Sequence, residues 1–198
     1  KICLSKEIAY LKESLIIENA EESINSFGFR GPEFSKEKPE STIRIFLVGG
    51  STMVNAEEPI EFTIAGYLQK KINNLNLDYN VEVINAGIGS AWSKTETKMI
   101  KEKIFDLQPD LIFVYDGWND LGPHFDGESN EKIWSERWQE TCELGKKMDV
   151  KIIVTLQALL GFGDRLLTDQ EYKNYFISHA PKFQQFYPLY IEQLNKLS

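Results

Sequence analysis

The chain has few of the residues that build metal, redox and membrane sites. Its 198 residues include two cysteines and two histidines. Cys3 and Cys142 have neither the number nor the spacing of a zinc site or a disulfide framework, so two free thiols are expected and their pairing stays open. No apolar run approaches the roughly 20 residues that cross a bilayer. The chain begins at Lys1 rather than Met, which indicates a processed or trimmed product.

Positive charge is also scarce. The formal net charge is −8, and no stripe of Lys and Arg is present that would face a nucleic-acid backbone. The glycine-bearing segments do not fit nucleotides, because "GGSTMVNAE" lacks the Walker lysine and "GIGSAW" has Trp92 where a dinucleotide fingerprint needs its third glycine. The aspartates at 116, 120 and 126 have no partners at a recognised metal-ligand spacing. No cofactor and no metal are therefore expected.

From Thr42 onward, short apolar runs alternate with amphipathic segments. This alternation predicts a parallel sheet covered by helices on both faces, an α/β fold of three layers. Strands are expected at 43–48, 81–86, 111–115 and 150–157, and helices at 60–75, 93–107, 130–148 and 183–197. Thr168 and Glu171 form a capping-box pattern, and Pro188 predicts a break or kink in the last helix. A parallel sheet that ends on a helix often has another strand to come, so the C-terminal part of the domain is expected to be missing.

The first 41 residues differ from the rest. Apolar residues at helical spacing predict an amphipathic helix over 5–24, and a segment rich in Gly and Pro then leads to the α/β domain. We therefore divide the chain into a helix and irregular arm, 1–41, and a domain, 42–198.

Residues that follow the strands are the candidates for chemistry, because loops and helix N-termini converge at the carboxyl ends of a parallel sheet. Ser51 follows the first strand in "FLVGGSTM", and there it is either an exposed nucleophile with an oxyanion-binding N–H or, together with Thr52, only a helix cap. The loop after the second strand offers a further N–H. Asn119 either offers a side-chain amide to the same oxyanion or only fixes its own turn.

Three of these segments together resemble a known family. "IFLVGGST", "VINAGIGSAWS" and "VYDGWND" look like the first three blocks of the SGNH (GDSL) hydrolases, which are esterases, lipases and carbohydrate O-acetyl esterases on a flavodoxin-like α/β/α sandwich. The third block, with Gly117, Asn119 and Asp120 after a strand, is the most specific. The resemblance spans about residues 27–157.

The resemblance implies a role for several residues of this chain. Ser51 would be the nucleophile, and its N–H would be the first oxyanion donor. The backbone N–H of Ser90, or of the adjacent Gly89, would be the second donor, provided that the backbone angles permit a serine there. Asn119 would be the third. Gly50 replaces the Asp that usually precedes the serine, which is tolerable because that Asp is not the proton acceptor.

One signature of the family is absent. An Asp-x-x-His pair should supply the base and its orienting carboxylate, but Leu121 stands three residues before His124, and Phe176 three before His179. Either histidine remains a secondary candidate for the base, with His124 alternatively a substrate-pocket residue. Two explanations stay open: the pair lies downstream of Ser198 and the protein is a serine ester hydrolase, or the domain is non-catalytic and serves in binding or cell-surface assembly.

The expected partner is a small-molecule or glycan ester, and no oligomeric state is predicted. The arm "FGFRGPEF" resembles the lead-in of extracytoplasmic members, which implies an extracytoplasmic or cell-surface location, and a cytoplasmic one stays open. Trp118, Trp134 and Trp138 either line a sugar-binding groove or pack in the core, and the i, i+4 spacing of the last two favours packing. The segment 161–171 is either a lid over Ser51 or a structural excursion.

Overall fold

Four parallel strands form a sheet in the order β2-β1-β3-β4. The computed structural model describes residues 24–121, 130–162, 165–173 and 177–197. All four strands were predicted, with each bound within one residue of the observed one. They are β1 (Thr42–Gly49), β2 (Asn80–Gly87), β3 (Leu111–Asp116) and β4 (Lys151–Leu156). Gly49 pairs with Gly87 on one side and with Tyr115 on the other, so these strands end at nearly the same level.

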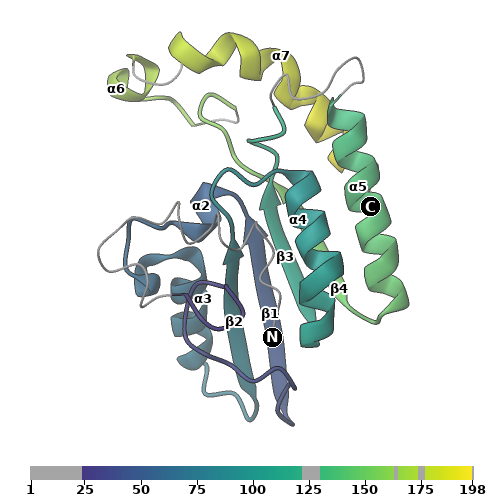
Figure 1. Cartoon of the computed structure of the whole chain (residues 1–198). Helices are drawn as coiled ribbons and strands as arrows, with labels where there is room; N and C mark the ends of the chain where they lie inside the picture. The colour runs from purple at the N-terminus through teal and green to yellow at the C-terminus, as the bar shows by residue number, and fades with distance from the viewer. Residues whose placement is uncertain (1–23, 122–129, 163–164, 174–176, 198) are drawn as a thin grey trace.

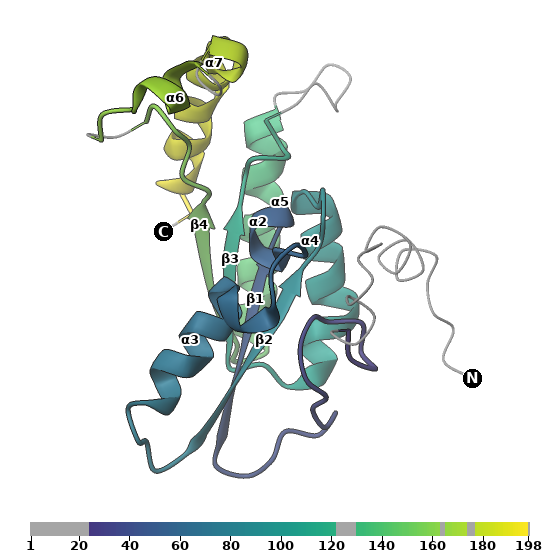
Figure 2. The ribbon, with the colours of Figure 1, turned by 90° about the vertical axis from the view of Figure 1, so that its left-hand side faces the viewer.

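Helices cover both faces of the sheet, as Figures 1 and 2 show. The even-numbered residues of the strands, such as Phe46, Ile112 and Val114, pack in the larger core with Trp134 and Trp138. The odd-numbered Leu47 packs with Met53 and Ala65 on the other face. Because successive side chains of a strand point to opposite faces, each continuous apolar run supplies both cores. The predicted three-layer α/β fold is confirmed.

The predicted helices are present, with changes in detail. Helix 60–75 is split by Thr63, whose hydroxyl accepts the Gly66 N–H and starts α3. The predicted helix 93–107 is an α-helix up to Met99, a wider π-helix over Ile100–Ile104 and a 3-10 helix over Phe105–Leu107. The last helix runs through Pro188, so no break occurs there. The helical elements are α2 (Ser51–Val54), η2 (Ile60–Phe62), α3 (Ile64–Asn73), α4 (Ser93–Met99), η3 (Ile100–Ile104), η4 (Phe105–Leu107), α5 (Asn130–Lys147), α6 (Asp169–Glu171) and α7 (Ile177–Leu194).

The arm before β1 packs into the α/β domain. Phe29 is buried in the larger core, where its ring meets that of Phe46 edge-on at 5.5 Å between centroids. The guanidinium of Arg44 donates to the carbonyl oxygens of Ser35 and Lys36, at 2.9 and 3.1 Å. The helix predicted over 5–24 lies almost entirely outside the described residues, as does Cys3. Cys142 is half-buried in α5, and burial raises the pKa of its thiol.

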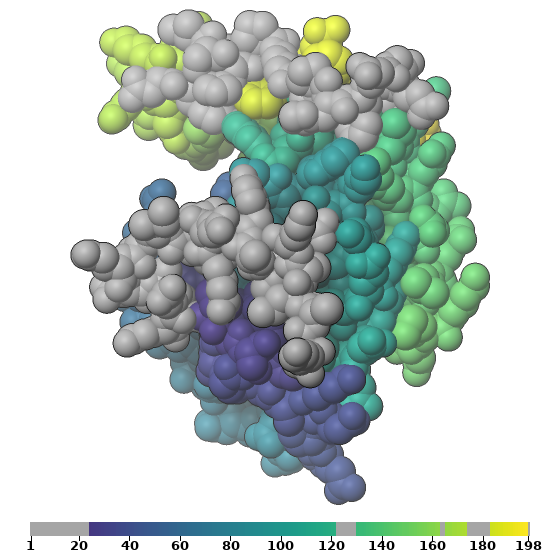
Figure 3. All heavy atoms as spheres, viewed as in Figure 1, coloured from purple at the N-terminus to yellow at the C-terminus, as the bar shows by residue number. Residues whose placement is uncertain are grey.

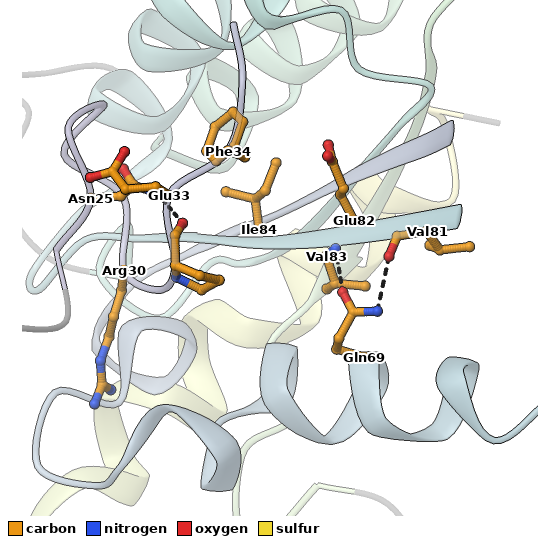
Figure 4. Close-up of a pocket in the computed structure, with 10 residues that line it drawn as sticks. Asn25, Arg30, Glu33, Phe34, Gln69, Val81, Glu82, Val83 and Ile84 are labelled. Carbon is orange, nitrogen blue, oxygen red and sulfur yellow. Dashed lines mark hydrogen bonds between the residues drawn. The ribbon is translucent and has the colours of Figure 1, made fainter. Parts of the chain in front are cut away.

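The β2 edge of the sheet is partly closed by one side chain of α3. The Gln69 amide donates to the Val81 carbonyl at 2.9 Å and accepts from the Val83 N–H at 2.8 Å, as a peptide group of a neighbouring strand would. Figure 4 shows these bonds beside a cavity of about 160 Å³ between the arm and β2. A single amide thus satisfies two groups of an edge strand that would otherwise be open to pairing.

Candidate active site

The carboxyl ends of the strands are joined by backbone hydrogen bonds. The Ile88 N–H donates to the Gly49 carbonyl at 2.9 Å, and the Gln157 N–H donates to the Asp116 carbonyl at 2.7 Å. A hydrogen bond therefore joins the loops after β1 and β2, and another joins the loops after β3 and β4. Figure 1 shows α2 at this end of the sheet, below α6 and α7.

Ser51 is the first residue of α2 and does not cap it. The N-cap is Gly50, and no side-chain cap bond is present. Ser51 is exposed, and its hydroxyl forms no hydrogen bond with the described residues. An N–H in the first turn of a helix has no partner within the helix. Both groups of Ser51 are therefore available to a ligand, at the positive end of a short turn.

Thr52, the residue after Ser51, is tied to the loop that follows β4. The Gln157 amide donates to the Thr52 hydroxyl at 3.0 Å. Gln157 itself is fixed through its carbonyl, which accepts the Tyr187 hydroxyl of α7 at 2.9 Å. Figure 3 shows a hollow between the yellow-green atoms of residues 165–173 and the body of the molecule below them.

Asn119 lies against the backbone that precedes Ser51. A Cβ atom added to Gly50 would stand 2.8 Å from the Asn119 amide nitrogen. The same nitrogen donates to the Ala91 carbonyl at 2.6 Å, and its second N–H has no acceptor among the described residues. This bond reaches a different loop, so Asn119 does more than fix its own turn. The contact also gives a steric reason for glycine at position 50, since a larger residue would displace the amide.

Ser90 lies in the loop that Asn119 contacts. It is exposed and has a φ of 59°, in the left-handed region that favours glycine. A serine tolerates this conformation at a cost of roughly 1–2 kcal/mol. The neighbouring Gly89 is exposed, and a Cβ added there would have no heavy atom within 4 Å. The Ala91 N–H closes the turn by donating to the Ile88 carbonyl at 3.1 Å.

Gly117 and Asp120, the other two residues that mark the third block, are buried and structural. Gly117 has a φ of 111°, and a Cβ there would stand 2.5 Å from a Leu156 methyl. The Asp120 carboxylate accepts the N–H of Ser93 at 2.9 Å and its hydroxyl at 2.5 Å. Asp120 thus fixes the start of α4 to the β3 loop, and its side chain is fully buried. Burial raises the pKa of Asp120 despite these bonds.

Near Asp120 lie two more buried acids, Asp116 and Glu96. Trp134 and Trp138 are fully buried, and their indole N–H groups donate to one Asp116 oxygen at 2.9 and 3.1 Å. The packing interpretation of these two tryptophans is therefore correct, and the sugar-groove interpretation is wrong for them. Burial, with the Asp120 charge, raises the pKa of Asp116 to about 8. Burial first, and then both aspartates, raise the pKa of Glu96 well above its usual range.

Neither histidine can be placed against Ser51. His124 lies in the segment 122–129, outside the described residues. His179 lies on α7, and its side chain is outside them too. The proposed lid, 161–171, is described except for residues 163 and 164; Thr168 and Glu171 form the predicted capping box there, and Arg165 pairs with Glu171 at 2.8 Å.

Sequence reasoning missed Gln157, Arg30 and Asn85 as residues near the site. Gln157 carried a usable signal, because it directly follows a predicted strand. In the described ranges, no three His, Cys, Asp or Glu side chains form a group that would hold a metal ion. No helix of those ranges is long and apolar enough to span a bilayer.

The parallel sheet and its covering helices have the same fold as solved SGNH hydrolases. The solved structure of AlinE4, an SGNH-hydrolase family esterase, aligns with a TM-score of 0.52 and 18% identity over 80% of this chain and 75% of that one. The acetyl xylan esterase AlAXEase aligns at 0.50 and 15%, over 77% and 80%. A variant of Axe2, an acetyl xylan esterase from Geobacillus stearothermophilus, aligns at 0.52 and 11%, over 82% and 76%. No family sequence model matches the chain, and no curated protein sequence does.

Proposed function

We propose that the protein is a serine ester hydrolase of SGNH type that acts on an acyl or acetyl ester. One observation carries the proposal: an exposed serine, whose hydroxyl has no hydrogen bond to the described residues, begins a helical turn, and the Asn119 amide lies against the residue before it. A serine hydroxyl and converging N–H donors are two of the parts that acyl transfer requires, and a general base is the third. Acetyl esters of carbohydrates are the substrate class favoured by the two acetyl xylan esterases of the same fold.

In the proposed reaction, the Ser51 oxygen attacks the ester carbonyl carbon, and the carbonyl oxygen becomes an oxyanion. The N–H groups of Ser51 and Ser90 and the amide of Asn119 would stabilise that charge. The hydroxyl proton passes to a general base, and from it to the departing alcohol as the ester C–O bond breaks. Water then hydrolyses the acyl-serine, which releases the carboxylic acid and restores Ser51. The base is one of the two histidines or a residue outside this sequence.

Turnover of p-nitrophenyl acetate by the full-length protein tests this proposal. We expect Ser51→Ala to abolish the protein-dependent rate, because the nucleophile is gone. Thr52→Ala is the matched control, since it removes the neighbouring exposed hydroxyl, and it should retain most of the rate. Equal rates for Ser51→Ala and the parent protein would overturn the assignment of Ser51.

The alternative is a non-catalytic domain of the same fold that only binds a ligand. One observation favours it: neither histidine has an aspartate three residues before it. The two proposals differ in a simple measurement, because a binding domain would retain an acetylated xylooligosaccharide without releasing acetate. Acetate release that depends on Ser51 would exclude the binding-only proposal.

A further inference from the structure

The short helix that carries Ser51 is held at its far end by side chains from two other segments. The helix α2 has four residues, so most of its carbonyl groups have no partner within it. The Asn85 amide donates to the Met53 carbonyl at 2.9 Å. The Arg30 guanidinium donates to the Val54 carbonyl at 2.7 Å, and also to the carbonyls of Asn55 and Glu58.

Arg30 and Asn85 are themselves joined. The Arg30 N–H donates to the Asn85 carbonyl at 3.1 Å, and the Asn85 side-chain oxygen accepts the Gly87 N–H at 3.0 Å. Both side chains are buried. In Figure 4, the Arg30 side chain points away from Asn25 and Glu33 of its own arm. Two segments distant in sequence, the arm and β2, thus meet at the end of α2.

The backbone of β2 also fixes the distance to α2. A Cβ added to Gly87 would stand 2.2 Å from the Val54 nitrogen, so only glycine allows this approach. The turn is therefore packed directly on the strand, while Arg30 and Asn85 bind its carbonyl groups. A cation is favoured at this end of a helix, and hydrogen bonds from a charged donor are the stronger ones.

We propose that Arg30 and Asn85 are positioning residues for Ser51. A single helical turn is not stable by itself, so its orientation depends on what holds its ends. At the N-terminal end Gln157 binds the Thr52 hydroxyl, but Ser51 must stay free for a substrate, so the carbonyl groups of the C-terminal end are the main place to hold the turn. Arg30 and Asn85 keep Ser51 directed at the loop of Ser90 and Asn119 without touching the substrate. The catalytic part of this inference rests on the proposed function.

Hydrogen exchange tests the inference without requiring activity. The N–H groups of Met53, Val54 and Asn55 bond within the turn, and their exchange can be compared with that of β3 amides in the same molecule. We expect Arg30→Gln, and more weakly Arg30→Lys, to speed exchange at residues 53–55 at least about tenfold relative to β3. Arg44→Gln is the matched control, because Arg44 is a buried arginine that binds other carbonyls. Arg44→Gln should leave the exchange rate at residues 53–55, relative to that of β3, unchanged.

Rescue by a small guanidinium ion separates positioning from a general loss of packing. A cavity of about 400 Å³ borders Arg30 and Asn85. Millimolar guanidinium should therefore restore slow exchange at residues 53–55 in Arg30→Ala and leave Arg44→Ala unchanged. If the protein is an esterase, Arg30→Gln should lower kcat about a hundredfold with little change in KM, since a 1 Å misplacement has such an effect.

The outcomes separate the two proposals. Uniform acceleration of exchange across the sheet, or no acceleration at residues 53–55, would overturn the positioning role whatever the activity. Local acceleration in a protein that hydrolyses no ester would support the holding of the turn and refute the proposed function. Local acceleration with unchanged kcat would show that the turn is held but that its position does not matter for the reaction, which contradicts the inference.

Discussion

Two groups of polar residues lie at the same end of the sheet and differ in what their polar atoms do. In the serine turn, Gly50–Val54, Ser51 and Thr52 are exposed, and the Ser51 hydroxyl has no bond to the described residues. The acid cluster, Glu96, Asp116 and Asp120, is buried beneath the β3 loop, and its aspartates bind Ser93, Trp134 and Trp138. Position at a strand end therefore does not by itself make a polar residue part of a site.

Between Ser51 and the two aspartates, the difference is one of remaining hydrogen-bonding capacity, whereas the carboxyl oxygens of the buried Glu96 have no hydrogen-bond partner among the described residues. A group that is to bind a substrate must keep donors or acceptors unused in the free protein, and the described residues leave the Ser51 hydroxyl and the second N–H of Asn119 unused. A buried group with unused capacity lowers stability instead. The buried aspartates use their capacity on indole, amide and hydroxyl donors. We expect substitutions in the serine turn and its loops to change activity, and substitutions in the acid cluster to change stability.

After Ser51→Ala, the largest effect is expected for Asn119→Ala. Loss of one oxyanion donor typically lowers kcat about 10²–10³-fold, which is about 2.7–4 kcal/mol of transition-state stabilisation. Steady-state kinetics on p-nitrophenyl acetate, with thermal unfolding alongside, measures both effects. Asn119→Asp is the companion variant, because it keeps the shape and replaces the donor with an acceptor. A normal kcat in either variant would remove Asn119 from the site.

The next largest effect is a loss of stability, expected for a substitution in the acid cluster. Asp120→Ala would leave the buried N–H and hydroxyl of Ser93 without their acceptor, at a cost of about 1–3 kcal/mol for each unsatisfied group. We expect urea unfolding to show a loss of about 2–4 kcal/mol in the free energy of unfolding. Asp120→Asn, which keeps one acceptor oxygen, should lose less. A loss below that of a typical exposed substitution would show that Asp120 does not hold α4.

The third effect depends on pH. In the unfolded chain Asp116 has the ordinary aspartate pKa of 3.8, whereas in the folded protein its pKa is about 8. The folded state therefore binds more protons between these values, and the free energy of unfolding should fall as pH rises from about 4 to about 8, by up to about 1.4 kcal/mol per pH unit. Asp116→Asn mimics the protonated acid and still offers an oxygen to both indoles.

Urea unfolding at several pH values checks this expectation. The Asp116→Asn variant should show a shallower dependence on pH and should exceed the parent protein in stability at pH 8. Part of the slope should remain, because the pKa of Glu96 is raised as well. Identical slopes for the two proteins would show that Asp116 is ionised in the folded state at neutral pH.

The smallest effect is expected for Ser90→Gly. Glycine relieves the left-handed strain at this position but costs about 0.5–1 kcal/mol through the unfolded chain, so the stability should change by less than about 1 kcal/mol. Since only the backbone N–H is proposed to act, kcat should change little. Ser90→Ala, which keeps the strain, is the control for the hydroxyl. A large loss of kcat in both variants would assign a role to the Ser90 side chain.

The sequence was sufficient for the strands because their apolar runs are continuous and end in glycine or polar residues. It also placed Ser51 and Asn119 at strand ends, and the structure brings the Asn119 amide against Gly50. It did not predict that Arg30 reaches Val54, because that contact joins an irregular arm to a turn 24 residues away. Spacing also did not show that Asn119 and Asp120 have different roles, because the two are adjacent in sequence. The structure shows the difference, since Asn119 is half-buried and Asp120 is buried.

The central claim is that Ser51 attacks the ester, and mass spectrometry of a covalent adduct tests it most directly. The full-length protein would be treated with a fluorophosphonate, which phosphonylates activated serines with loss of fluoride, and then digested. We predict a single phosphonylated peptide that contains Ser51, with no labelling of the Ser51→Ala variant and slower labelling of Asn119→Ala. An adduct on a different residue, or ester hydrolysis by a protein that is not labelled at Ser51, would contradict this account.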